Sequence, residues 1–118
     1  MFSKVYSTTI TGITAYVVTV EVDVGRGLPV FDMGGYLSTE VKERVRIALR
    51  NSGYEQKPRR ITVNISPADI HKYGTGFDLP IAIGILGAQD EVNMTAFEDM
   101  VIIGELSLDG TVNPVKGI

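Results

Sequence analysis

Gly74-Thr75-Gly76-Phe77-Asp78-Leu79-Pro80-Ile81-Ala82-Ile83-Gly84-Ile85-Leu86-Gly87 is the stretch on which the fold depends. A glycine-rich loop leads into an almost wholly apolar segment, and after Asp78 the next charge is Asp90. The segment is too short to cross a bilayer and too apolar to lie on a surface, which predicts a buried helix reaching about Glu91. Asp78 is placed to cap this helix, its carboxylate accepting a first-turn N–H. Pro80 is tolerated in that turn because its missing N–H would have no intrahelical partner.

Length and composition indicate one globular domain. A chain of 118 residues, 44% apolar and 21% charged, can bury a single core. The net charge of -3 gives no overall attraction to nucleic acid or to an anionic membrane. The absence of cysteine excludes thiol catalysis, disulfides and thiolate metal sites, and a single histidine, His71, excludes multi-histidine metal sites. The sequence has no signal-peptide pattern and no apolar stretch of transmembrane length, so we expect no membrane association and a cytoplasmic location.

Extended segments occupy the first third of the chain. Val5 to Ile10 reads as a strand that Gly12 ends, and Leu28 to Met33 as a short strand that Gly34-Gly35 ends. Between them, residues 13–24 alternate in the manner of a strand with one wet face. The apolar face of that strand is predicted to hold Tyr16, Val18, Val20, Val22 and Val24.

A second set of patterns completes the architecture. Ser38 is placed to cap a helix, Gly53 to end it, and the apolar positions between them recur at helical spacing: Leu37, Val41, Val45, Ala48 and Leu49. We expect a strand at residues 61–65, a long loop at 66–76, a strand at 100–103 and a hairpin turning at Asp109-Gly110. The order β-β-β-α-β-α-β-β predicts an α+β fold with two helices on one face of a mixed sheet.

Charge is distributed unevenly along the chain. Acids cluster between Asp90 and Asp109, and within the first helix Glu40 with Arg44 and Glu43 with Arg46 are spaced to pair. Seven of the eleven basic residues fall between positions 42 and 60: Lys42, Arg44, Arg46, Arg50, Lys57, Arg59 and Arg60. This basic segment is the candidate surface for contact with DNA or with another subunit, although a solvated helix face explains it as well.

Two local patterns are weak indications of a functional site, one of a catalytic triad and the other of an anion-binding loop. Ser66, Asp69 and His71 contain the residue types of a catalytic triad, but triad members normally come from separate elements. Gly74-Thr75-Gly76 could hold an anion at a helix start, yet Asp78 would place a negative charge there. We therefore predict no catalytic residue from these patterns.

Several motifs in order resemble one protein family. They are Ile61-Thr62-Val63-Asn64-Ile65-Ser66-Pro67-Ala68-Asp69, Gly76-Phe77-Asp78-Leu79-Pro80-Ile81-Ala82 and Gly104-Glu105-Leu106-Ser107-Leu108-Asp109-Gly110. Shorter matches are Gly27-Leu28-Pro29, Val41-Lys42-Glu43-Arg44-Val45-Arg46 and Asn51-Ser52-Gly53-Tyr54. Together they resemble the N-terminal domain of magnesium-chelatase-related AAA+ ATPases of the competence protein ComM/YifB type, over nearly the whole chain.

The resemblance implies a Lon-protease-like domain of the ribosomal protein S5 domain 2-like fold, covering residues 1–118 as one unit. It also implies a longer protein whose ATPase module binds ATP and Mg²⁺, forms hexameric rings and remodels DNA by helicase or branch-migration activity. No Gly-Lys-Ser or Gly-Lys-Thr occurs here, so we expect this chain to be a fragment without that module or its cofactors. The remainder of that protein is then its first expected partner.

The same resemblance locates the position at which Lon-type proteases carry their nucleophile. In Asp78-Leu79-Pro80-Ile81-Ala82 the serine position falls at Ile81, which has no nucleophilic group, and the activating lysine position falls beyond Ile118. The prediction is a non-catalytic accessory domain that serves assembly or DNA contact. The alternatives are a peptidase domain with hydrolytic activity of its own and a stand-alone nucleic-acid-binding module.

Overall fold

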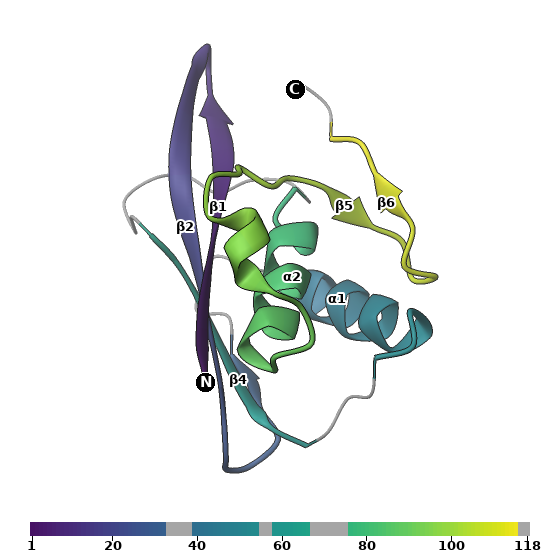
Figure 1. Cartoon of the computed structure of the whole chain (residues 1–118). Coiled ribbons are helices and arrows are strands. Elements are labelled where there is room, and N and C mark those ends of the chain that lie inside the picture. The colour runs from purple at the N-terminus through teal and green to yellow at the C-terminus, as the bar shows by residue number, and fades with distance from the viewer. Residues whose placement is uncertain (33–38, 55–57, 67–75, 116–118) are drawn as a thin grey trace.

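The computed structural model describes residues 1–32, 39–54, 58–66 and 76–115. A four-stranded sheet in the order β1-β2-β4-β3 forms one layer, and the helices α1 and α2 lie on one of its faces (Figure 1). The strands of this sheet are β1 (Phe2–Thr11), β2 (Thr14–Gly25), β3 (Phe31–Asp32) and β4 (Arg60–Ser66). Because β3 pairs with β4 in parallel while the other pairs are antiparallel, the sheet is mixed, as the sequence predicts.

The alternation in β2 is confirmed for most of its length. Val18, Val20, Val22 and Val24 are buried against the helices, and the residues between them face outward. Tyr16 was predicted to join them but is 41% exposed, because β4 accompanies β2 only from Thr19 onward. Gly12 makes the tight connection to β1 with a φ of +64°, a conformation that costs glycine little.

Helix α1 (Thr39–Asn51) buries the predicted apolar positions Val41, Val45, Ala48 and Leu49. Its end follows the Schellman pattern. Tyr54 N–H donates to the Leu49 carbonyl at 3.1 Å, Gly53 N–H donates to the Arg50 carbonyl at 3.1 Å, and Gly53 has a φ of +92°. The predicted cap Ser38 and the apolar Leu37 lie outside the described residues.

Helix α2 (Asp78–Ala88) is the buried helix that its apolar sequence predicts. It packs on β1, β2 and α1, and Ile81 and Ile85 are fully buried. It ends before the predicted Glu91 because Asp90 adopts a left-handed conformation with a φ of +59°. Glu91 N–H then donates to the Leu86 carbonyl at 2.8 Å, which closes the helix end.

The last third of the chain differs from the prediction at one strand. Residues 100–103 contribute only a parallel bridge between Val101 and Tyr6, because the preceding residues form a short 3₁₀ helix, η2 (Met94–Phe97), that turns the chain over α2. The predicted hairpin is confirmed as β5 (Glu105–Leu106) and β6 (Val112–Asn113).

The strand predicted at residues 28–33 is shorter than expected, since β3 is limited to Phe31–Asp32.

Candidate functional site

The start of α2 is held by Asp78, but not in the way the sequence predicts. The helix begins at Asp78 itself, Phe77 occupies the cap position, and no side chain caps the helix. The Asp78 carboxylate accepts hydrogen bonds from Arg44 Nε at 2.8 Å and Arg44 Nη2 at 3.1 Å. It also accepts the Leu106 N–H at 3.0 Å. The capping prediction is therefore wrong, because the carboxylate turns toward α1 and β5 instead of toward its own helix.

Asp78 and Arg44 form a bidentate ion pair inside the domain. The Asp78 side chain is fully buried and that of Arg44 is 21% exposed. The hydrogen bonds to Asp78 raise the pKa of Arg44 above its usual value and outweigh the opposing effect of burial. Since one carboxylate joins α1, α2 and β5, this contact fixes the two helices and the hairpin relative to one another.

Because Arg44 forms this ion pair inside the domain, it is not one of the solvent-facing residues of the predicted basic segment. Sequence spacing pairs Arg44 with Glu40, whereas the structure pairs it with a residue 34 positions away. The predicted pairing of Glu43 with Arg46 is confirmed, since Arg46 Nη2 lies 2.6 Å from Glu43 Oε2. The sequence did contain an indication that the Arg44 side chain turns inward, because Arg44 lies at the border of the apolar face of α1, directly before the buried Val45.

Pro80 and Ile81 close the position where the resemblance would place a nucleophile. Both side chains are fully buried, and Ile81 N–H donates to the Phe77 carbonyl at 3.0 Å. Together with the buried carboxylate of Asp78, they make the first turn of α2 part of the core. A substrate would have to displace packed side chains to reach this turn.

The glycine loop before α2 is explained by packing where the structure describes it. A Cβ on Gly76 would lie 2.9 Å from Ile103 Cγ1, and the Gly76 carbonyl accepts the Gly104 N–H at 3.0 Å. Gly76 therefore allows residues 103–104 to approach closely. Gly74 and Thr75, the other residues of the anion-site hypothesis, lie outside the described residues.

The triad hypothesis gains no support from its described member. Ser66 Oγ lies 3.3 Å from Glu21 Oε1 and 3.2 Å from Asn64 Nδ2, on the open face of the sheet. Asp69 and His71 lie outside the described residues. Ser66 Oγ is therefore engaged with the Glu21 carboxylate and the Asn64 amide, neither of which belongs to the hypothetical triad.

The basic segment is spread over two elements. Arg46 and Arg50 are exposed on α1, and Arg60 is exposed at the start of β4. Lys42 and Arg59 are partly exposed, and Lys57 lies outside the described residues. Without Arg44, the exposed guanidinium groups are fewer than the sequence suggests, and Arg46 already has an acidic neighbour.

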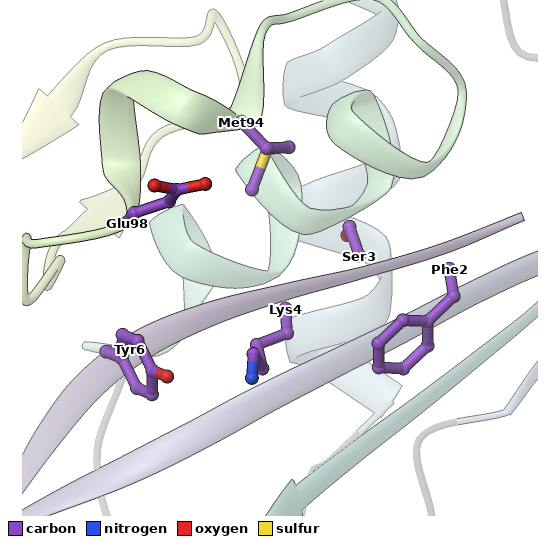
Figure 2. A pocket seen from close by; sticks show the side chains of 6 residues that line it. All are labelled: Phe2, Ser3, Lys4, Tyr6, Met94 and Glu98. Carbon is purple, nitrogen blue, oxygen red and sulfur yellow. The ribbon is translucent and has the colours of Figure 1, made fainter.

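A shallow hollow of about 390 Å³ lies beside β1, where sequence analysis predicts no site. Its lining residues are Phe2, Ser3, Lys4, Tyr6, Met94 and Glu98 (Figure 2). Lys4 Nζ lies 5.8 Å from the centre of the Tyr6 ring, a cation–π contact. These residues come from β1 and the η2 region, so only the tertiary structure brings them together.

Neither a metal centre nor a membrane span is found among the described residues. No group of three or more His, Cys, Asp or Glu side chains is arranged to hold a metal ion in this part of the chain. No helix within it is long and apolar enough to cross a membrane.

Comparison with known proteins identifies the family. Residues 20–118 match the family model described as subunit ChlI of Mg-chelatase, and the chain belongs to this family. It is 42% identical over 118 residues to the uncharacterized protein YifB of Escherichia coli K12, a match that covers 98% of this chain and 23% of YifB.

The other relatives support the same assignment. The chain is 43% identical over 117 residues to the competence protein ComM of Haemophilus influenzae, covering 97% of this chain and 23% of ComM. It is 34% identical over 118 residues to an uncharacterized protein of Mycobacterium tuberculosis H37Rv, covering 98% of this chain and 24% of that protein. The chain thus spans about a quarter of the length of these relatives, and the predicted ComM/YifB type is confirmed.

Proposed function

We propose that this chain is the non-catalytic N-terminal accessory domain of a magnesium-chelatase-related AAA+ ATPase. In this proposal it has the Lon-protease-like, ribosomal protein S5 domain 2-like fold, and it serves assembly, DNA contact or both within an ATP-driven DNA-remodelling protein. ATP and Mg²⁺ belong to the ATPase module, the remainder of the chain is its first partner, and the whole protein is a cytoplasmic hexamer. Membership of the ChlI family and the likeness to a competence protein support this context.

The non-catalytic part of the proposal depends on one observation. Ile81, which the resemblance places at the position of the Lon nucleophile, is fully buried in the first turn of α2. Beside it, both oxygens of Asp78 accept hydrogen bonds from protein groups, so this carboxylate is already committed to structure. A hydrolase needs an exposed nucleophile with a base in reach, and this turn offers neither.

A serine-reactive probe tests this part directly. The 118-residue chain is incubated with a fluorophosphonate probe and, separately, with a casein substrate, alongside an active serine peptidase as control. We expect no labelled serine in the mass spectrum and no release of peptides. Labelling of any serine, or peptide release above the buffer blank, would overturn the non-catalytic assignment.

DNA binding is tested by titration of duplex DNA at low and moderate salt. If Arg46, Arg50 and Arg60 bind phosphates, replacing all three by Ala weakens binding and lowers the slope of log K against log salt by about 0.9 for each phosphate that is no longer neutralised. Lys4→Ala is the matched control, because it removes an exposed positive charge outside the basic segment. Absence of binding at low salt, or an equal effect per charge in the control, would remove DNA contact from the proposal.

A further inference from the structure

The hollow beside β1 exposes backbone groups on the outer edge of that strand. β1 is the terminal strand in the order β1-β2-β4-β3, so only one of its edges pairs within the sheet. Met1 and Val24 exchange both backbone hydrogen bonds, so the odd-numbered residues of β1 pair with β2. The even-numbered residues direct their N–H and C=O groups to the outer edge. There Phe2 and Lys4, which both line the hollow, have no backbone partner among the described residues.

The edge is open at Phe2 and Lys4 because the segment beside it turns away. Val101 bridges Tyr6, and the Tyr6 carbonyl accepts the Ile102 N–H at 2.8 Å, so this segment accompanies β1 at Tyr6. Before Val101 the chain forms η2, which lies over α2 (Figure 1). The hollow of about 390 Å³ occupies the space beside Phe2 and Lys4.

Side chains from two elements form the two walls of the hollow. Phe2, Lys4 and Tyr6 lie on the open face of the sheet, whereas Met94 and Glu98 lie on the helix side of β1 (Figure 2). Phe2 is 60% exposed, so a large apolar side chain is available at this edge. A strand added beside β1 would meet one wall with every second side chain and the other wall with the side chains between them.

Each wall carries a charged group that is available to a ligand. Neither Lys4 nor Glu98 belongs to an ion pair in the described part of the chain. The Lys4 ammonium lies 5.8 Å from the centre of the Tyr6 ring. Glu21, directly opposite Lys4 on β2, accepts a hydrogen bond from Asn64 Nδ2 at 2.9 Å. The hollow therefore presents a cation on the open face and a carboxylate on the helix side.

We propose that this hollow binds an extended segment of another protein as an additional strand, antiparallel to β1, with an acidic residue opposite Lys4. These two residues exchange both backbone hydrogen bonds, and their side chains form a cross-strand ion pair on the open face. The neighbouring residue of the segment points to the helix side, where a basic side chain packs its stem on Met94 and pairs with Glu98. Two positions after the acidic residue, an apolar side chain lies opposite Phe2. This binding site goes beyond the proposed assembly and DNA contact.

Charge favours such a segment over a nucleic acid and over a second copy of the chain. Lys4 is the one basic residue that lines the hollow in the described part of the chain, whereas Glu98 and Asp99 are exposed acids, so a polyanion is repelled. A second copy brings no carboxylate to Lys4, because the edge-facing residues of β1 include no acid. They are Phe2, Lys4, Tyr6, Thr8 and Ile10.

A titration with short blocked peptides, followed through the amide resonances of the isotope-labelled 118-residue chain, tests the proposal. The probe is acetyl-Arg-Glu-Arg-Val-Thr-amide, whose Glu takes the place opposite Lys4 between two basic neighbours. We expect the amide resonances of Phe2 and Lys4 to shift most, with a dissociation constant of about 1 mM or below. Methylating the Glu nitrogen removes the N–H directed at Lys4 and is expected to weaken binding about tenfold. Methylating the nitrogen of the following Arg, which points away from β1, is the matched control and is expected to have a smaller effect.

A charge exchange tests the ion pair on the open face. Lys4→Glu is expected to weaken binding of the probe about tenfold and to favour acetyl-Arg-Lys-Arg-Val-Thr-amide, which the wild type binds less well than the probe. Lys42→Glu makes the same charge change on α1, outside the hollow, and is expected to leave both affinities as in the wild type. Circular dichroism verifies that each variant is folded. If Lys4→Glu does not fold, Lys4→Gln replaces it and is expected to bind the two peptides equally.

Three results would overturn the proposal. They are the absence of a saturable shift at Phe2 and Lys4, equal affinity of the wild type for the two peptides, and unchanged affinity after methylation of the Glu nitrogen. A shift of the same resonances with protein concentration alone would identify a second copy as the occupant and would refute the proposal as well.

Discussion

Replacing Asp78 by Ser separates two roles that a carboxylate at a helix start can have. Serine is about as good a helix cap as aspartate, so a purely capping Asp78 would tolerate the change with little loss. In the structure, however, the carboxylate binds Arg44 through two hydrogen bonds and the Leu106 N–H through a third. Serine cannot reach both partners and has no charge, so we expect a large loss of stability.

The structure sets the size of this loss. Removing one partner of a buried ion pair costs about 3–5 kcal/mol, because the other charge is left uncompensated. The side chain of Arg44 is 21% exposed, so its guanidinium recovers part of its hydration and the lower end of that range applies. We therefore expect Asp78→Ser to lower the free energy of unfolding by about 3 kcal/mol, a large share of the 5–15 kcal/mol typical of a domain.

Urea unfolding followed by far-UV circular dichroism measures this loss. A double-mutant cycle with Arg44→Met isolates the pair, and we expect a coupling energy of at least about 1 kcal/mol, with the double variant less destabilised than the sum of the singles. The reasoning is refuted if Asp78→Ser lies within about 0.5 kcal/mol of the wild type, as for an ordinary surface change, or if the coupling energy is zero within error.

Two further predictions concern the helix α2 and the last hairpin. Gly84→Ala places a Cβ 2.5 Å from Cγ2 of the core residue Val22, so we expect a loss of about 1–3 kcal/mol in urea unfolding. The matched change Gly87→Ala meets Cγ, Sδ and Cε of Met94, a flexible and only partly buried side chain that can move aside, so it should cost less, and equal losses would contradict this account. In the hairpin, the Thr111 N–H donates to Asp109 Oδ1 at 2.9 Å and lowers the pKa of Asp109 below its usual value. A lowered pKa contributes stability above the unfolded-state pKa, and this contribution is lost as pH falls through the folded-state pKa. The Thr111 amide resonance should therefore titrate with a midpoint below the ordinary aspartate value, and Asp109→Asn should abolish that titration; a midpoint at or above the ordinary value would contradict the assignment.

Local patterns in the sequence were sufficient to predict most of the secondary structure. The alternation of β2, the helical spacing of α1, the apolar run of α2 and the Asp-Gly turn each depend on neighbours a few residues apart, and each is confirmed. The predictions failed where a distant partner or an unexpected dihedral angle intervened. Asp90 ended α2 early through its left-handed backbone, and η2 reduced the strand at residues 100–103 to a single bridge.

The family, too, was predictable from motifs along the chain. Only the tertiary structure decided what Asp78 does. The local sequence makes it a cap, and packing α1 and β5 against the start of α2 makes it the acceptor for Arg44 and Leu106. Sequence spacing cannot reveal such a contact, because residues 34 and 28 positions apart meet only once the helices have packed on the sheet. A buried carboxylate then takes the partners that best compensate for its lost hydration, wherever in the chain they lie.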